Sequence, residues 1–259
     1  MRIIDLHTHL GKWFFPIEKV TVHDFLRVME RNGIETSVIS SSRAVFHDFR
    51  IGNRELADAI QTDKRLLGFL FLNPNYLEES LQEMDRYMGQ EEFVGLGELY
   101  HKGYIGDQTI DSYGHMRILE RLLERFPQRL VLFHCFGEGF EALAKVATRF
   151  PQITFIAGHM GGPEFEPAIE CLREVDNVYL EICSSSPVSG KIETAVQKVG
   201  AGRVVFGSDS TLLNPAFIIG TVVDSRISDG EKEQILYQNG RRLLAASEVA
   251  SRNAAPHGA

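Results

Sequence analysis

Two histidines separated by a single residue stand near the start of the chain. His7 and His9 follow the apolar pair Ile3-Ile4 and the acidic residue Asp5. Because side chains alternate along a β-strand, both imidazoles and the carboxylate of Asp5 would project from the same face. Two imidazoles on one face can chelate a divalent metal ion, although a hydrogen-bonded pair of surface histidines would show the same spacing. Asp5 would either orient an imidazole or fill the next layer of the core.

Four further polar residues each end an apolar segment. They are Glu98, His134, His159 and Asp209, and they follow runs rich in Val, Leu, Ile and Phe. Aspartate and histidine are costly to bury without a partner, so these positions need a reason. A single histidine at the end of a core strand is more often structural than a ligand. Together with the two histidines above, however, the set offers nitrogen and oxygen donors without cysteine, which suits Zn²⁺, Mn²⁺, Ni²⁺ or Fe²⁺.

Short apolar segments alternate with longer amphipathic segments along the chain. The short segments are apolar at odd and even positions alike, which is typical of parallel strands buried on both faces. The amphipathic segment Val22–Asn32 follows a potential N-cap, Thr21, and precedes Gly33, which favours a helix with these bounds. The predicted strands are Arg2–Leu6, Thr36–Ser40, Leu66–Leu72, Phe93–Glu98, Arg129–His134, Ile153–His159, Asn177–Ile182 and Arg203–Gly207. The other predicted helices are Asn53–Asp63, Tyr76–Met88, Ser112–Arg125, Gly139–Phe150, Pro163–Val175, Pro187–Val199, Pro215–Asp224 and Ser228–Ala246.

This alternation predicts an α/β protein with a single (β/α)8 barrel, a TIM barrel, over residues 1–246. The last helix, Ser228–Ala246, would be additional and pack outside the barrel, and residues 247–259 would form a flexible tail. The alternative is an open doubly wound sheet, which calls for a glycine-rich turn after the first strand, where this chain has Asp-Leu-His-Thr-His. Because the chemistry of such barrels lies at the carboxyl ends of the strands, all six polar residues would meet at one end.

The composition is that of an ordinary globular protein. The chain has 259 residues, of which 44% are hydrophobic and 24% charged, and its formal net charge is −8. This acidic balance disfavours a nucleic-acid partner. No apolar run reaches the ~18–20 residues that span a bilayer, the first residues lack the layout of a signal peptide, and three widely spaced cysteines indicate reduced thiols. We therefore expect a cytoplasmic protein with no membrane partner, and the sequence leaves open whether it forms a homo-oligomer.

Six motifs, taken in order along the chain, resemble those of the amidohydrolase superfamily. The motifs are Ile-Asp-Leu-His-Thr-His, Gly-Leu-Gly-Glu-Leu, Phe-His-Cys, Gly-His-Met-Gly-Gly, Phe-Gly-Ser-Asp-Ser and Tyr-Gln-Asn-Gly-Arg-Arg-Leu-Leu. The fourth and the sixth look most like the amidohydrolase-related branch, and the resemblance covers nearly the whole chain. It implies that His7, His9 and His134 are metal ligands. It further implies that His159 is a ligand or polarises the substrate, and that Asp209 is a ligand and a proton acceptor.

The end of the fourth predicted strand departs from the pattern of many relatives. Two-metal members often have a carboxylated lysine there, whereas this chain has Glu98, and Lys102 follows further along. A glutamate that bridges two metals at this place is similar to the TatD-type hydrolases. Other relatives of the branch are one-metal decarboxylases and lactonases, so Glu98 would bridge two ions, bind one, or orient a neighbouring ligand. We expect zinc, and two ions rather than one.

The predicted activity is hydrolysis of a C–N, C–O or P–O bond in a small-molecule substrate by a metal-bound water. Asp209 would accept the proton of that water and return it to the leaving group, while His159 would stabilise the oxyanion or complete a second metal site. The alternative is a metal-dependent decarboxylase of an aromatic or unsaturated carboxylic acid on the same scaffold. The acidic charge disfavours a nuclease, and the intact set of polar strand ends disfavours an inactive binding module.

Specificity would come from the loops that follow the strands. Arg43 and Arg50 in the second loop and Lys102 in the fourth would bind a substrate carboxylate or phosphate, unless they are ordinary surface charges. Trp13 would form part of a lid or pocket wall. Glu181, near the end of the seventh predicted strand, would either reach the site or serve as a cap or ion-pair partner.

Overall fold

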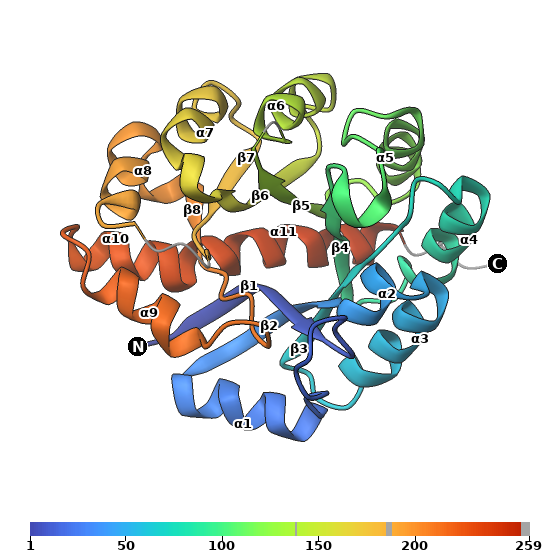
Figure 1. Cartoon of the computed structure of the whole chain (residues 1–259), viewed down its shortest axis with the longest axis horizontal. Helices are drawn as coiled ribbons and strands as arrows, with labels where there is room; N and C mark the ends of the chain where they lie inside the picture. The colour runs from blue at the N-terminus through green and yellow to red at the C-terminus, as the bar shows by residue number, and fades with distance from the viewer. Residues whose placement is uncertain (138, 185–187, 255–259) are drawn as a thin grey trace.

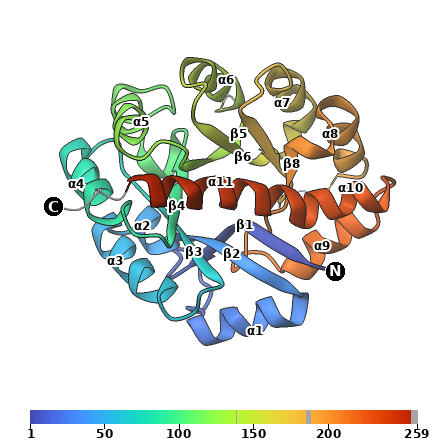
Figure 2. The same cartoon turned by 180° about the vertical axis from the view of Figure 1, so that it is seen from behind.

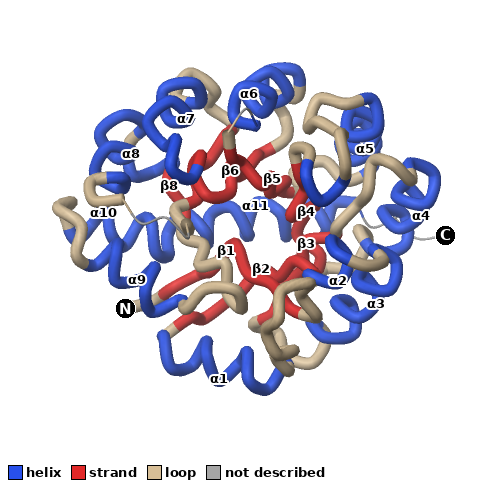
Figure 3. Tube along the Cα trace, in the orientation of Figure 1, coloured by secondary structure: helices blue, strands red, loops and turns tan. Residues whose placement is uncertain are grey.

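Eight parallel β-strands stand side by side in chain order around a ring, and helices cover the outside of that ring (Figures 1 and 3). The computed structural model describes residues 1–137, 139–184 and 188–254, with side chains described up to residue 247. The strands are β1 (Ile3–Leu10), β2 (Ile34–Ser41), β3 (Leu66–Leu70), β4 (Phe93–Tyr100), β5 (Leu130–Phe136), β6 (Thr154–Gly161), β7 (Val178–Glu181) and β8 (Val204–Val205). The predicted (β/α)8 barrel with an additional C-terminal helix is confirmed.

Helices follow the strands as the alternating sequence pattern predicts. The α-helices are α1 (Val22–Asn32), α2 (Ser42–Phe46), α3 (Phe49–Ile60), α4 (Leu77–Tyr87), α5 (Tyr113–Arg125), α6 (Gly139–Arg149), α7 (Phe165–Leu172), α8 (Lys191–Val199), α9 (Pro215–Val223), α10 (Asp229–Glu233) and α11 (Asn239–Ala254). Short helical turns are η1 (Gly103–Ile105), η2 (Gly162–Glu164), η3 (Ala201–Arg203) and the π-helical η4 (Gln234–Gln238). Within the described residues, none of these helices has the length and apolar character that a membrane crossing requires.

The first helix shows why local sequence alone could set its bounds. The hydroxyl of Thr21 accepts a hydrogen bond from the Asp24 N–H at 3.1 Å, which satisfies one of the free N–H groups of the first turn. Gly33 ends the helix with a left-handed backbone, φ +68°, which a residue without a side chain adopts at little cost. The helix α1 therefore has the predicted bounds.

The segment after β2 is helical where the sequence predicted a loop. The hydroxyl of Ser41 caps α2 by accepting from the Ala44 N–H at 3.2 Å. The carboxylate of Asp48 caps α3 by accepting from the Arg50 N–H at 2.9 Å. The expected loop positions are thus corrected, because Arg43 lies in α2 and Arg50 in the first turn of α3.

Two helix boundaries near the end of the chain also differ from expectation. The described part of α8 begins at Lys191, and its predicted start, Pro187, lies outside the described residues. The last helix continues to Ala254 rather than ending at Ala246, and the side chain of Ser247 is buried. Residues 255–259 of the predicted tail lie outside the described residues.

The last helix, α11, crosses the amino-terminal opening of the barrel (Figure 2). The amide of Asn239 donates to the carbonyl oxygens of Ala201 and Val204, both at 2.7 Å. Near the other end of the helix, the hydroxyl of Ser247 donates to the carbonyl of Val94 at 3.0 Å. Since these carbonyls lie near the beginnings of β8 and β4, α11 closes the end of the barrel opposite the strand carboxyl ends.

Apolar side chains line both faces of the strands, as the sequence pattern indicated. A large cluster packs between the strands and the surrounding helices, and a smaller one fills the barrel interior. The interior cluster consists of Ile4, Leu6, Val38, Phe69, Val94, Leu130, Leu132, Ile156, Val205, Tyr237, Leu243 and Leu244. The last three come from η4 and α11, so the closing helix is part of the barrel core.

Hydrogen bonds between β1 and the segment after β8 close the ring. The strand β8 ends earlier than predicted, and residues 206–210 continue beside β1 without forming a regular ladder. The N–H of Asp209 donates to the carbonyl of His7 at 2.8 Å. The buried carboxyl of Asp5 accepts from the N–H and the hydroxyl of Ser208 at 3.0 and 2.6 Å. Burial raises the pKa of Asp5 to about 7 despite these bonds. Asp5 therefore holds the barrel seam, and its carboxyl does not contact an imidazole ring.

Candidate metal centre

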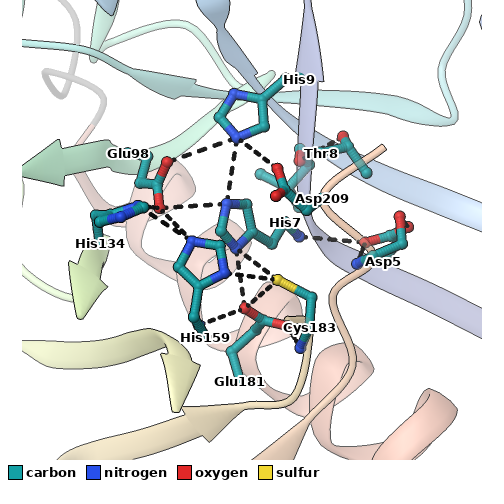
Figure 4. Close-up of polar contacts among 12 residues, drawn as sticks. Asp5, His7, Thr8, His9, Glu98, His134, His159, Glu181, Cys183 and Asp209 are labelled. Atoms are coloured by element: carbon teal, nitrogen blue, oxygen red, sulfur yellow. Dashed lines mark hydrogen bonds and ion pairs between the residues drawn. The ribbon is translucent and has the colours of Figure 1, made fainter. Parts of the chain in front are cut away.

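Six polar side chains converge at the carboxyl ends of the strands, around the carboxylate of Glu98 (Figure 4). They are His7 and His9 of β1, Glu98 of β4, His134 of β5, His159 of β6, and Asp209 after β8. All are buried except His134, which is partly exposed. The structure therefore brings together the whole set of residues that the sequence predicted as ligands.

One group of donor atoms forms on the β1 side of the site. The Nε2 atoms of His7 and His9 lie 3.2 Å apart. The two carboxylate oxygens of Glu98 lie 3.4 Å from His7 Nε2 and 3.5 Å from His9 Nε2. Asp209 Oδ1 lies 3.3 Å from His9 Nε2, on the side opposite Glu98 in Figure 4. This group offers two nitrogens and up to two carboxylates.

A second group forms around Oε1 of the same glutamate, the oxygen that also faces His7. His134 Nδ1 lies 2.8 Å from Glu98 Oε1, and His159 Nε2 lies 3.3 Å from the same oxygen. The two ring nitrogens are 3.1 Å apart. Glu98 thus belongs to both groups and stands between two pairs of imidazoles.

The spacing of these donors fits a bound metal ion. In each group the donor atoms of the two histidines and Glu98 lie within 4.8 Å of one another. Four ligands placed tetrahedrally at ~2.0–2.1 Å from Zn²⁺ are separated by roughly 3.3 Å, which is close to most of the distances above. Nitrogen and carboxylate donors in this number suit a divalent cation of the zinc type.

The charges of the site keep Glu98 in the form that can bind a cation. Burial raises the pKa of the Glu98 carboxyl, but the charges of His134 and His7 outweigh it and hold that pKa well below its usual range. Burial lowers the pKa of His159, and the nearby His134 lowers it further. Glu98 is therefore a carboxylate at neutral pH, and His159 favours the neutral form that ligates a metal.

Two of the six residues have an uncommon backbone conformation. His159 and Asp209 lie in the left-handed region, at φ +63° and +57°. Such positions cost a side-chain-bearing residue about 1–3 kcal/mol and tend to occur at functional sites. The backbone of His159 is held from both sides, because its N–H donates to Glu181 at 3.0 Å and its carbonyl accepts from the Lys191 ammonium at 2.9 Å. The surrounding structure therefore fixes the ring of His159 in place.

A family model described as amidohydrolase matches this sequence over residues 4–245. The chain belongs to the amidohydrolase family. The match spans nearly the whole barrel, so the resemblance that the six motifs indicated is confirmed. A comparison with curated proteins gives no match.

Solved structures share the amidohydrolase barrel with this chain. A 2,6-dihydroxybenzoate decarboxylase from Rhizobium is 17% identical with a TM-score of 0.72, covering 94% of this chain and 98% of its own. A dihydroxybenzoic acid decarboxylase from Polaromonas, with bound manganese and an inhibitor, is 18% identical with a TM-score of 0.73, covering 94% and 97%. A putative 2-pyrone-4,6-dicarboxylic acid hydrolase from Pseudomonas putida is 17% identical with a TM-score of 0.71, covering 95% and 98%. At these identities the likeness supports the fold and not a particular reaction.

Three residues of this amidohydrolase site carried weak sequence signals or none. Glu181 does reach the site, where its carboxylate lies 2.9 Å from His7 Nδ1. Cys183, which follows β7, places its sulfur 3.1 Å from His159 Nδ1. Tyr100 lies beyond the predicted end of the fourth strand at Glu98 but ends β4 in the structure, and its hydroxyl donates to Glu98 at 2.7 Å. The hydrogen bond from Tyr100 restrains Glu98 Oε2, the carboxylate oxygen that His134 does not contact.

The predicted substrate-binding cations have partners of their own. The Arg43 guanidinium donates to Glu55 at 2.6 Å, and that of Arg50 donates to Asp48 at 3.3 Å. Lys102 is the second residue after the end of β4, and η1 begins at the next residue. The structure places none of these three side chains among the converging six, so their part in substrate binding stays a prediction.

Trp13 forms one wall beside the converging histidines. Its ring centroid lies 4.9 Å from that of His9, and its indole N–H donates to the hydroxyl of Thr211 at 3.2 Å. The indole is buried and also packs against Phe46, at 5.5 Å between ring centroids. This position fits the pocket wall that the sequence predicted.

Proposed function

We propose that the protein is a metal-dependent hydrolase of a small-molecule substrate, with zinc as the favoured ion and two ions rather than one. The observation that carries this proposal is the position of Glu98. Its carboxylate oxygens lie 2.8–3.5 Å from a ring nitrogen of each of the four histidines of the site. A carboxylate shared by two imidazole pairs suits a bridge between two cations. The proposed ligands are His7, His9, Glu98, His134, His159 and Asp209.

A divalent ion bound there supplies positive charge that polarises a substrate oxygen and makes a nearby water more acidic. Asp209 is placed to take the proton that this water loses. Its Oδ1 faces His9 Nε2, its side chain is 10% exposed against 2% for His9, and its N–H is anchored on the carbonyl of His7. The carboxylate therefore meets solvent at the open end of the site while its backbone is fixed.

Asp209, His159 and Trp13 each have a role in the later part of the proposed reaction. After the bond to the substrate forms, the proton on Asp209 passes to the leaving group, so the carboxylate is regenerated and the step is balanced. His159, held rigidly by its backbone bonds, would face the charge that develops on the attacked group. Trp13 and its aromatic neighbours exclude water from the side of His9, which strengthens the electrostatic interactions within the site.

Metal analysis and a substrate screen test the proposal. Protein purified without chelator is analysed for bound transition metals and assayed with lactones, esters, amides and phosphodiesters. Asp209→Asn should abolish most of the activity found, whereas the control Asp176→Asn, at an exposed position beside Arg203, should retain it. Full activity in Asp209→Asn, or activity that survives removal of all metal, would contradict the proposal.

A metal-dependent decarboxylase of an aromatic or unsaturated carboxylic acid is the second candidate. It is favoured by the aromatic surroundings of the site, since the rings of Tyr100 and Phe136 stack against His134 at 4.8 and 5.0 Å. Decarboxylases are also among the solved structures of similar fold. The ion pairs that engage Arg43 and Arg50 weigh against it, because a carboxylate substrate needs a cationic partner.

Isotopes from the solvent separate the two reactions. In water enriched in ¹⁸O, hydrolysis places a solvent oxygen in the product, whereas decarboxylation does not. In deuterated water, decarboxylation leaves deuterium on the carbon that lost the carboxyl group. Release of carbon dioxide with deuterium on that carbon would replace the hydrolase proposal with the decarboxylase.

A further inference from the structure

A second layer of polar groups lies directly behind the rings of two candidate ligands. The Nε2 atoms of His7 and His159 face Glu98, whereas their Nδ1 atoms face Glu181 and Cys183. All four of these contacting side chains are buried. The proton on a neutral imidazole sits on one nitrogen only, and the lone pair that binds a metal is on the other. The contact at Nδ1 therefore influences which nitrogen carries the proton, and so whether Nε2 has a free lone pair for a metal ion.

For His7 the inner contact is a carboxylate. Glu181 Oε2 lies 2.9 Å from His7 Nδ1, and the same carboxylate accepts hydrogen bonds from the N–H groups of Cys183 and His159. An ionised carboxylate can only accept hydrogen bonds. Glu98, the carboxylate that faces Nε2, is farther from the ring, at 3.4 Å. The shorter contact to Glu181 therefore favours the proton of a neutral His7 ring on Nδ1, which leaves the lone pair on Nε2.

For His159 the group that contacts Nδ1 is the Cys183 thiol, which itself donates a hydrogen bond. The Cys183 thiol donates to Glu181 Oε2 at 3.0 Å, so the sulfur lone pairs remain to accept from another group. His159 Nδ1 lies 3.1 Å from that sulfur. One consistent arrangement uses each proton once: His159 Nδ1–H donates to the sulfur, the thiol donates to Glu181, and His7 Nδ1–H donates to the same carboxylate.

The carboxylate of Glu181 is itself fixed in position. The N–H of Cys183 donates to Glu181 Oε1 and the N–H of His159 donates to Oε2. A side chain at Gly207 would clash, because a Cβ there would lie 2.5 Å from Glu181 Oε1 and 2.6 Å from the Cβ of His7. The glycine thus makes room for the carboxylate beside the ring that it contacts.

His9 shows that a histidine of this site need not have a hydrogen-bond partner behind its ring. Its Nδ1 is buried and has no hydrogen-bond partner among the described residues. Although His7 and His9 project from the same strand, only His7 has an acceptor behind its ring. Burial next to the site is therefore not sufficient to provide such a contact.

We propose that Glu181 and Cys183 are positioning residues that hold the ring protons of His7 and His159 on Nδ1, so that both rings present an unprotonated Nε2 to the metal centre. This inference rests on the proposed metal-dependent function for its purpose, but it concerns the protein without metal as well. Acceptors behind metal-binding histidines typically change metal affinity by about 10–100-fold. Neither residue needs to touch the substrate.

Nuclear magnetic resonance of the histidine rings tests the proposal directly. Protein with ¹⁵N-labelled histidine is stripped of metal and titrated upward until the ring signals stop changing, so that the rings are neutral. His115 serves as an internal reference, because its Nδ1 lies 2.7 Å from the carbonyl of Thr109 and must carry the proton. We expect the wild-type signals of His7 and His159 to match the His115 pattern. Protonation of either ring on Nε2 would overturn the proposal.

Substitutions separate a positioning role from a merely structural one. Glu181→Gln should mix the two proton positions of His7 and weaken zinc binding, measured by competition with a chelator, by about 10–100-fold. The control Glu170→Gln removes an exposed carboxylate on α7 and should change neither quantity. Cys183→Ala should release the His159 proton from Nδ1, whereas Cys183→Ser should restore it, since a hydroxyl also donates and accepts. The serine and alanine pair keeps the test decisive if Glu181→Gln does not fold.

Two further measurements separate this inference from a metal site at Cys183 and from the proposed hydrolase function. Addition of Co²⁺ to the wild-type protein should give no sulfur-to-metal absorption band, because the thiol acts as a hydrogen-bonding group. A band that disappears in Cys183→Ser would overturn the proposal and make the inner cluster itself a metal site. Ring protons on Nδ1 in a protein that binds zinc but hydrolyses nothing would overturn the proposed hydrolase and support this inference.

Discussion

The two ends of the barrel are made from the same strands and differ in nearly every chemical respect. At the carboxyl end, ionisable side chains meet around Glu98, and His159 and Asp209 have left-handed backbones. At the amino end, α11 closes the opening with apolar side chains, and Asn239 satisfies two backbone carbonyls. Most of the buried ionisable groups of the barrel meet at the carboxyl end, whereas packing dominates the amino end, where the buried Arg129 donates to neutral oxygens of Ser247 and Met88.

This difference teaches how one fold can carry a costly site. Buried ionisable groups and left-handed residues reduce stability where they occur, so the favourable packing must come from elsewhere in the molecule. In barrels of this type the carboxyl end serves chemistry and the amino end serves stability. If the division holds here, substitutions at one end should change activity alone, and those at the other should change stability alone.

The largest effect should come from Asp209→Asn at the carboxyl end. Asparagine tolerates the left-handed backbone but cannot accept the proton, so we expect kcat/KM to fall by about 10²–10⁴-fold. The free energy of unfolding in urea should change by less than about 0.5 kcal/mol, as for substitutions that disturb no packing. A loss of stability comparable to the loss of activity would break the division between the two ends.

Removal of metal should give the next largest effect. It should lower the free energy of unfolding only by the amount that metal binding contributes. A cation that binds the folded state alone stabilises it by about 2.7 kcal/mol at a free concentration of 100 times its Kd. Thermal unfolding with and without chelator measures this increment. The same increment is expected in Leu243→Ala at the amino end, because distant sites add independently. An increment that shrinks in that variant would show that the two ends are coupled.

Asn239→Ala should give an intermediate effect on stability and none on chemistry. It leaves the carbonyls of Ala201 and Val204 without their donor, which should cost about 1–3 kcal/mol in the free energy of unfolding. Urea denaturation measures the loss, and chelator competition measures zinc affinity, which should stay at the wild-type value. A weaker affinity for zinc would sharpen the comparison by showing that closure of the barrel also shapes the site.

The smallest effect should come from His115, which is buried on α5 and belongs to neither end. Burial lowers the pKa of its ring to about 4, so the unfolded chain binds a proton more readily than the folded one. The resulting stability is complete above the unfolded pKa of about 6.5 and is lost as the pH falls toward 4. Between pH 7 and pH 5, wild type should therefore lose about 1–2 kcal/mol more than His115→Gln. Equal losses in urea titrations at the two pH values would show that the ring is not neutral in the fold.

The sequence predicted the converging residues because each one interrupts an apolar run at the end of a strand. Each of these residues alone could be structural, but six ionisable side chains at the same end of one barrel are best explained by a shared site. Tyr100 could not be placed in the same way. Its position depends on how far β4 pairs with β5, where Tyr100 lies opposite His134, and this pairing comes from the tertiary structure.

Helix boundaries also differ in whether nearby residues or distant contacts determine them. The bounds of α1 were predictable because Thr21 and Gly33 act within a few residues. The short helix α2 needed the cap from Ser41, which a strand-like sequence pattern concealed. The helix α11 passes its predicted end at Ala246 where a distant segment contacts it, since the Ser247 hydroxyl accepts from Arg129 at 3.1 Å. Local chemistry was readable from the sequence, whereas contacts between distant segments were not.

The seam between β1 and the segment after β8 has a consequence for how the protein is made. His9 is synthesised long before Asp209, whose carboxylate lies 3.3 Å from it in the folded protein. A growing chain therefore carries His7 and His9 without the aspartate that completes their donor set until Asp209 has emerged. The complete donor set for a cation at that place forms only after β8 has been made.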